Sequence, residues 1–130
     1  MRNERLEAFE TALMEILKSI DGALEARYGN VLRRHPSRPA EGQTANPQYD
    51  GLFAVIANFS AGIGSQYGAG YTLDLRISTL DSVDPQLRAD CEALMVERLR
   101  AALPTVFPGR QLQVERDRYG WKLFGDLSLD

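Results

Sequence analysis

The chain has little histidine and little cysteine, and each shortage excludes a class of chemistry. It has one cysteine, Cys91, so no disulfide can form within the chain and a reducing compartment is the default expectation. Its one histidine, His35, stands beside a proline in a loop-like segment, so neither a Ser-His-Asp nor a Cys-His arrangement is indicated. No cysteine and histidine residues have the spacing of zinc ligands. We therefore expect a protein that is not an enzyme, with no cofactor, no metal and no small-molecule substrate.

Long apolar runs and a strongly positive charge are missing as well. No run approaches the roughly 20 apolar residues that span a bilayer, so no membrane partner is expected. Residues 1–5 lead directly into a charged helical pattern, without the apolar core of a signal peptide. The formal net charge of −3 argues against a surface tuned as a whole for nucleic acid. The expected location is the cytoplasm.

What is present is typical of one folded domain. The 130 residues are 44% apolar and 25% charged, which are ordinary globular values. Residues 3–28 predict an amphipathic helix, because apolar side chains recur at spacings of three and four. That stripe consists of Leu6, Phe9, Leu13, Ile16, Leu17, Ile20 and Leu24. Residues 30–50 follow as a long loop that contains three prolines and several arginines.

The rest of the chain is organised around a predicted β-hairpin. Residues 52–59 form a continuous apolar run of strand length, and residues 71–79 alternate apolar and polar side chains. The alternation places one set of side chains on a face that must be covered: Tyr71, Leu73, Leu75 and Ile77. The glycine-rich segment 61–70 joins the strands. We expect it to be mobile, because it has no apolar periodicity with which to dock on the core.

A second helix follows the hairpin. Asp84 and Pro85 are a strong helix start, and Pro104 predicts its end. Cys91 lies on the apolar stripe of this helix, so we expect an inert core thiol rather than a nucleophile. Small and apolar side chains widen the apolar surface on one flank of the helix: Ala89, Ala93 and Val96.

A second hairpin closes the chain. Residues 111–115 and 121–129 have strand patterns, and residues 117–120 form a tight turn between them. The element order is therefore α-β-β-α-β-β. It predicts a single α+β domain over residues 1–130, with a four-stranded antiparallel sheet and both helices on one face.

The first strand favours assembly as the function. Both of its faces are apolar, as in a strand covered on both sides, yet two helices cover only one face. Leu52, Ile56 and Phe124 lie on the other face, where either the long loop or another subunit must cover them. An exposed apolar patch of this kind is typical of association rather than catalysis. We predict a non-enzymatic assembly subunit, a homo-oligomer with these three residues in its interface.

A first alternative rests on the long loop. Three guanidinium groups gather there: Arg33, Arg34 and Arg38. Arginines on an exposed loop bind phosphate through bidentate hydrogen bonds. This cluster predicts a nucleic-acid or anion-binding module.

A second and less favoured alternative rests on carboxylates of the outer sheet face. Asp74, Glu115 and Asp126 lie on neighbouring predicted strands and suit a divalent cation, which would make a metal-dependent enzyme. Arg76 and Lys122 share that face. The favoured interpretation is therefore a lattice of cross-strand salt bridges.

The order of elements resembles that of phage tail-terminator and tail-completion subunits. Three segments carry the resemblance: the proline-bearing loop 36–47, the strand 71–79 leading into residues 81–84, and the closing turn 117–121. Members of that family form rings in virions and are not enzymes. The resemblance implies a tail or neck ring component located in the virion. The same order also resembles small secretion-chaperone domains, which carry further elements not found in this sequence.

Overall fold

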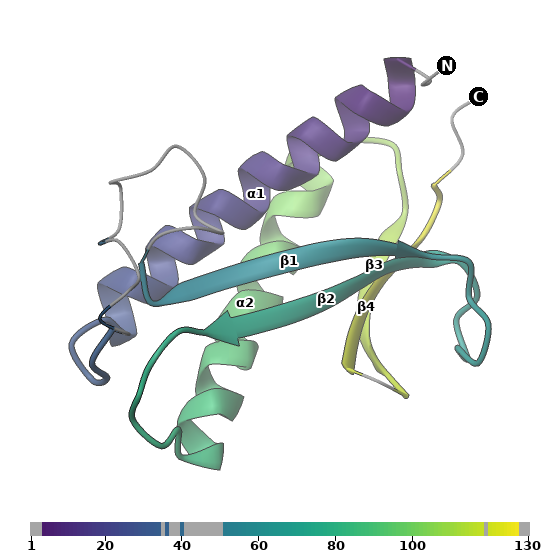
Figure 1. Cartoon of the computed structure of the whole chain (residues 1–130). Coiled ribbons are helices and arrows are strands. Elements are labelled where there is room, and N and C mark those ends of the chain that lie inside the picture. Colours follow the sequence, from purple (N-terminus) through teal and green to yellow (C-terminus); the bar gives the residue numbers. More distant parts are fainter. Residues whose placement is uncertain (1–3, 35, 37–39, 41–50, 119, 128–130) are drawn as a thin grey trace.

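A computed structural model describes residues 4–34, 36, 40, 51–118 and 120–127 of the chain. It confirms an α+β fold with the element order α-β-β-α-β-β (Figure 1). The elements are α1 (Glu4–Tyr28), β1 (Phe53–Ser60), β2 (Gly70–Ile77), α2 (Pro85–Val106), β3 (Leu112–Asp117) and β4 (Gly120–Gly125). Neither described helix combines the length and the apolar character needed to span a lipid bilayer.

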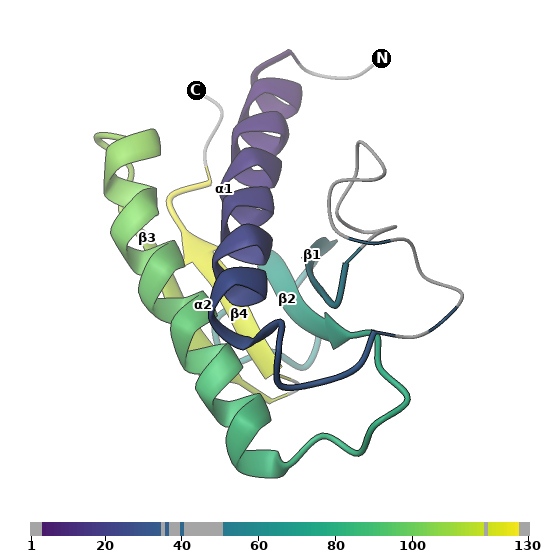
Figure 2. The same ribbon diagram turned by 90° about the vertical axis from the view of Figure 1, so that its left-hand side faces the viewer.

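The four strands form one antiparallel sheet in the order β1-β2-β4-β3. Each hairpin is paired along most of its length, whereas β2 and β4 share a ladder of only three residue pairs, from Tyr71–Leu123 to Leu73–Trp121. Both helices pack on the same face of this sheet (Figure 2). The molecule therefore has two layers, as the sequence predicts.

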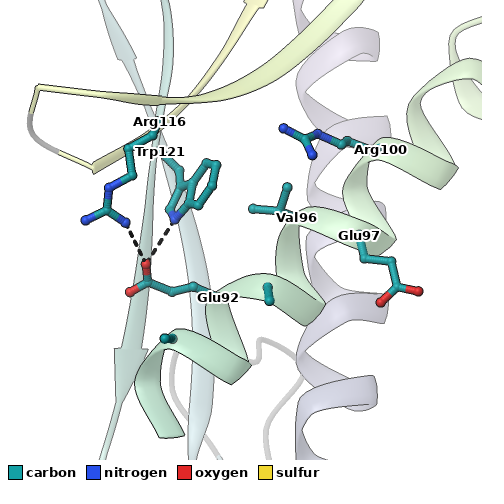
Figure 3. A pocket seen from close by; sticks show the side chains of 8 residues that line it. Glu92, Val96, Glu97, Arg100, Arg116 and Trp121 are labelled. Carbon is teal, nitrogen blue, oxygen red and sulfur yellow. Dashed lines mark hydrogen bonds and ion pairs between the residues drawn. The ribbon is translucent and has the colours of Figure 1, made fainter. Parts of the chain in front are cut away.

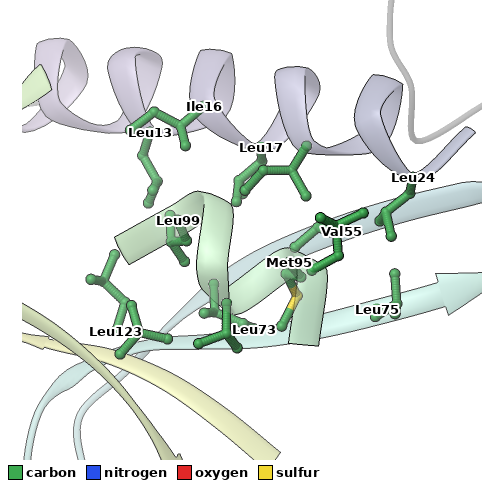
Figure 4. Packing of buried hydrophobic residues seen from close by; sticks show 14 of the residues in the cluster. Leu13, Ile16, Leu17, Leu24, Val55, Leu73, Leu75, Met95, Leu99 and Leu123 are labelled. Carbon is green, nitrogen blue, oxygen red and sulfur yellow. The ribbon is translucent and has the colours of Figure 1, made fainter. Parts of the chain in front are cut away.

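The core lies between the helices and the sheet (Figure 4). Its buried side chains include Leu13, Ile16, Leu17 and Leu24 of α1, Met95 and Leu99 of α2, and Val55, Leu73, Leu75 and Leu123 of the strands. Cys91 is fully buried among them, and this burial raises the pKa of its thiol to about 11. The predicted core thiol is confirmed, because a group with so high a pKa stays protonated and is a poor nucleophile.

Helix α2 begins as predicted but ends later. The Asp84 carboxylate accepts a hydrogen bond from the backbone N–H of Gln86 (2.7 Å), and Pro85 is the first helical residue. The predicted end at Pro104 is wrong, since the helix runs to Val106. The ring of Pro104 lies on the exposed side, and the N–H of Phe107 still bonds to the carbonyl of Leu103 (2.8 Å). The proline removes one donor close to the helix end, where the loss is tolerated.

Helix α1 closes part of one sheet edge. The buried carboxylate of Asp21 accepts a hydrogen bond from the backbone N–H of Val55 (2.8 Å). Glu25 accepts from the N–H groups of Leu52 and Phe53. The N–H groups of Phe53 and Val55 are on the side of β1 that faces away from β2, and free donors at a sheet edge invite pairing with another chain. Two acidic residues of α1 therefore protect the first half of β1.

The opposite edge, formed by β3, is protected by basic and amide groups. The Arg100 guanidinium of α2 donates to the carbonyl of Val114 (2.7 Å). Gln66, in the loop between β1 and β2, donates through its amide to the carbonyl of Arg116 (3.5 Å). Side chains of two distant elements thus cover the edge carbonyls of β3.

The loop between β1 and β2 folds back over the outer sheet face. We call its residues 62–69 the strap. The ring of Tyr67 stacks on Phe124 with 4.2 Å between centroids and 9° between planes. Lys122, whose side chain is 1% exposed, donates to the carbonyl of Gly68. The predicted mobility of the strap stays a prediction, but the reason for expecting it is wrong, because the strap contacts the sheet without apolar periodicity. Its aromatic ring and carbonyls replace the missing apolar periodicity.

The strap and the core together revise the predicted interface patch. Leu52 is only 2% exposed and belongs to the hydrophobic cluster, so it is not available to another subunit. Phe124 is half-buried beneath Tyr67, and Ile56 is half-buried as well. The chain itself thus buries Leu52 and covers part of Phe124. Ile56 as an interface residue stays a prediction.

Candidate functional site: a groove between α2 and the second hairpin

An open groove lies between the flank of α2 and the second hairpin (Figure 3). Its volume is about 490 Å³. The lining residues are Ala89, Glu92, Ala93, Val96, Glu97 and Arg100 of α2, Arg116 of β3 and Trp121 of β4. Helix α2 thus supplies three small or apolar side chains and three charged ones to the groove, while the strands supply one indole ring and one guanidinium group.

Glu92 holds the strand side of the groove in place. Its carboxylate accepts a hydrogen bond from the indole Nε1 of Trp121 (2.9 Å) and an ion-paired one from Arg116 (3.2 Å) (Figure 3). Its second oxygen pairs with Arg88 one turn earlier (3.3 Å). The Arg116 guanidinium also lies over the Trp121 ring, 5.6 Å from its centroid. The Trp121 ring is therefore held by two neighbours, Glu92 and Arg116.

Arg100 bounds the other end of the groove. Besides the carbonyl of Val114, its guanidinium contacts the carboxylate of Glu115 (3.2 Å). The charged groups that bound the groove at Glu92, Arg100 and Arg116 thus have partners within the chain. The floor between them is apolar, so the arrangement suits an apolar side chain better than a charged substrate.

A second, shallower hollow lies beside the strap. It measures about 730 Å³ and is lined by Gly64, Ser65, Gln66, Arg116, Asp117 and Arg118. Asp117 is its central group. Its carboxylate accepts from the hydroxyl of Ser65 and from the backbone N–H groups of Gln66 (3.3 Å) and Arg118 (2.8 Å). Arg116 lines both hollows, so the groove and the strap form neighbouring parts of one surface.

The hydrogen bonds to Asp117 predict a loss of stability in acid. The Ser65 hydroxyl first, then the Arg118 and Gln66 N–H groups and the Lys122 ammonium, lower the pKa of Asp117 below its usual value. A lowered pKa in the folded state contributes stability above the unfolded pKa of about 4, and that stability is lost as the pH falls through the folded value. We expect the thermal unfolding midpoint to fall as the pH drops from about 5 to about 2.

Two variants distinguish the contribution of Asp117 to acid stability from that of the other carboxylates. Asp117→Asn should show a smaller fall over the same pH range than the wild type, measured by circular dichroism. Ser65→Ala, which removes the first of these donors, should move the acid transition to higher pH. Identical acid profiles for all three proteins would show that Asp117 does not contribute.

The arginine cluster of the loop is only partly described. Arg33 forms an ion pair with Asp81 (2.8 Å), and its backbone N–H donates to the same carboxylate. The side-chain hydrogen bond raises the pKa of Arg33 and lowers the pKa of Asp81. Arg34 is exposed and forms a β-bridge with Thr79. Arg38 and His35 lie outside the described residues. The structure thus ties Arg33 to the segment after β2, which weakens the anion-binding alternative.

The three carboxylates of the metal alternative are not brought together. Asp74 pairs with Arg76 (3.1 Å), Glu115 with Arg100, and Asp126 with Arg110 (4.0 Å). Among the residues that the structure describes, no group of three histidine, cysteine or acidic residues is placed to hold a metal ion. Each carboxylate has its own arginine, but none of these three pairs joins neighbouring strands, and Lys122 pairs with Asp117 instead. The arrangement therefore differs from the predicted lattice of cross-strand salt bridges.

Trp121 and Glu92 are the main groove residues that sequence reasoning missed. They are 29 positions apart, and no local pattern connects them. The available signal was the widened flank of α2, at Ala89, Ala93 and Val96. Those side chains lie beside the apolar stripe that faces the core and are not needed to complete it. In the structure they line the groove.

Fold and groove together define a two-layer α+β protein with an apolar groove on its second helix. The chain belongs to a protein family described as "Uncharacterised protein", whose family model matches residues 4–125. It is similar to an uncharacterized protein of Borreliella burgdorferi, with 34% identity over 125 residues, covering 96% of this chain and 98% of that protein. No solved structure matches the chain. The matched residues run from the first residue of α1 to the last of β4, so they include every element of the fold.

Proposed function

We propose that the protein is a non-enzymatic assembly subunit that binds another protein chain in the groove between α2 and the second hairpin. One observation carries this proposal. The floor of the groove is apolar, and the charges of Glu92, Arg100 and Arg116 around it are already paired within the chain. A ligand that enters gains by removing apolar surface from water. Of the four charged side chains that line the groove, only Glu97 lacks an ion pair within the described part of the chain.

The composition of the groove favours a protein over a small molecule. Ala89 and Ala93 are exposed, so a neighbouring backbone or side chain can approach the helix closely. Trp121 and Arg116 are of the residue types that are enriched at binding hot spots, and both are held in place before a partner arrives. Such preorganisation lowers the entropy lost on association.

The proposed partner is another copy of the same chain. The order of elements, on which the sequence resembles phage tail-terminator subunits, makes a ring of identical subunits the most specific form of this proposal. Repeated head-to-tail contacts between two different surfaces of one subunit generate such rings. Under this proposal the chain would function in a virion tail or neck.

A charge placed in the groove should weaken the assembly. We expect the wild type to have a mass above 14.5 kDa at micromolar concentration, measured by light scattering. Ala93→Arg puts an unpaired charge on the apolar floor and should lower that mass. Ala101→Arg is the matched control, because Ala101 is also exposed on α2 but does not line the groove.

The two variants decide the proposal together. A lower mass for Ala93→Arg, with Ala101→Arg unchanged, supports the groove as the binding surface. Equal masses for all three proteins would contradict it. Circular dichroism should show the same helix content in the variants, since both positions face solvent.

A further inference from the structure

The direction in which each backbone N–H and C=O group of β1 points can be worked out residue by residue. The N–H groups of Phe53 and Val55 bond to α1, on the side away from β2. The carbonyl of Leu52 instead accepts from Ser78, just beyond β2. Because a strand alternates these directions, the N–H and C=O groups of Ala57 and Phe59 must also point away from β2. The second half of β1 therefore has its own row of outward-facing donors and acceptors.

No side chain covers this row within the described part of the molecule. Asp21 and Glu25 protect only the start of the strand, and α1 then diverges from β1 towards its own N-terminus (Figure 1). No hydrogen bond to the backbone of Ala57 or Phe59 from outside the sheet is found among the described residues. The β3 edge differs, since Arg100 and Gln66 cover its carbonyls.

The chemistry of this edge favours pairing rather than solvation. No charged residue occurs anywhere from residue 51 to residue 73, although edge strands usually carry charges that prevent pairing. Two large apolar side chains are exposed, Phe59 at 64% and Met14 at 54%. Met14 lies seven positions before Asp21, so it is on the side of α1 that faces this edge. Backbone donors, acceptors and apolar surface are thus exposed together.

We propose that the second half of β1 pairs antiparallel with β1 of a second copy, about a two-fold axis at Asn58. In this register Ala57 lies opposite Phe59 of the partner subunit, and Phe59 lies opposite the partner's Ala57. The two opposed pairs exchange four backbone hydrogen bonds, because both residues direct their polar groups outwards. Each phenyl ring covers a small alanine, so large and small side chains complement each other across the axis.

A second copy is the occupant that this edge fits. Outward N–H and C=O groups at alternate residues require an extended strand, and the edge itself supplies an identical one. Isologous pairing closes after two chains, because the strand has no further free edge. Asp21 and Glu25 end the pairing at the first half of β1. The interface lies apart from the groove, which stays open in each subunit, and the inference does not depend on the groove.

A cysteine at the axis tests the register. Asn58 would lie opposite Asn58 of the partner subunit as a non-hydrogen-bonded pair. The two Cα atoms would be about 4.5 Å apart, and this distance suits a disulfide. Asn58→Cys should therefore form a disulfide-linked species of twice the chain mass under mild oxidation at micromolar concentration. Thr72→Cys is the control. It is exposed on the same sheet face, opposite Asn58 on β2, and should form at least tenfold less of that species. Cys91 is buried and does not compete.

A charge tests the apolar part of the interface. Phe59→Lys should lower the mass in light scattering, whereas Ile63→Lys, the same kind of change at a residue 95% exposed in the strap, should not. Asn58→Cys should still cross-link when combined with Ala93→Arg. This result would show that pairing at the β1 edge does not depend on binding in the groove.

Three results would overturn the proposal. One is cross-linking of Asn58→Cys that is no faster than that of Thr72→Cys. Another is an unchanged mass for Phe59→Lys. The third is hydrogen exchange in which the amides of Ala57 and Phe59 are equally protected at all protein concentrations, because that would mean a segment of the same chain covers the edge. Protection that rises with concentration supports the dimer.

Discussion

Gly70→Ala is expected to destabilise the protein by about 3 kcal/mol, the cost of a severe overpacking. A Cβ atom at Gly70 would come within 3.0 Å of the carbonyl oxygen of Leu123, and real Cβ atoms do not approach other atoms that closely. That oxygen belongs to the backbone of β4 and cannot rotate away. The strands β2 and β4 share only three residue pairs, and Gly70 directly precedes the first of them. The added methyl group would therefore push apart two strands that have few hydrogen bonds between them. Urea denaturation should show a lower midpoint with the same slope.

A glycine in open space provides the control. Gly22 is inside α1 and has no atom within 4 Å of where a Cβ would stand. Gly22→Ala should stabilise the protein by about 0.5–1 kcal/mol, because alanine loses less backbone entropy in a helix. A Gly70→Ala protein that unfolds at the wild-type midpoint would show that β4 can move without cost.

Asp21→Ala is expected to destabilise the protein by about 2 kcal/mol, in the range measured for buried hydrogen bonds to charged groups. Asp21 is 5% exposed, and its carboxylate bonds to the N–H of Val55. Alanine would leave that donor at the sheet edge without its partner, and it would also leave a small void. Urea denaturation measures the change.

Asp21→Asn separates the hydrogen bond from the charge. The amide oxygen of asparagine can still accept from Val55, so this variant should lose less stability than Asp21→Ala. Equal losses would assign the effect to the charge of Asp21. Wild-type stability in Asp21→Ala would mean that water replaces the carboxylate at no cost.

The elements of the fold were predictable because their signals are local. The stripe of α1 and the alternation of β2 define which side chains face the core, and each pattern lies within one segment. The start of α2 follows from Asp84 and Pro85 for the same reason. Its last turn was not predictable from the sequence, because it depends on the ring of Pro104 facing solvent rather than a neighbour.

The groove and the strap were not predictable because they join distant residues. Ser65 and Asp117 are 52 positions apart, and neither has a neighbour in the sequence that indicates the other. Phe124 was correctly identified as an apolar side chain that needs a cover, but the predicted cover was the long loop or another subunit. The cover is Tyr67 of the same chain, since a loop rich in glycine can turn back on the sheet. Periodicity reveals that a face needs a cover, but not which residue provides it.

The short ladder between β2 and β4 divides the sheet into two hairpins that can each form within a local stretch of chain. Isolated hairpins close in microseconds, whereas strands far apart in the sequence must first overcome loop-closure entropy. Helix α2 lies between them in the sequence, so the pairing of β4 with β2 is a long-range contact. We therefore expect the joining of the two hairpins to limit the folding rate. Changes at this junction should slow folding, whereas changes at the outer edges should mainly accelerate unfolding.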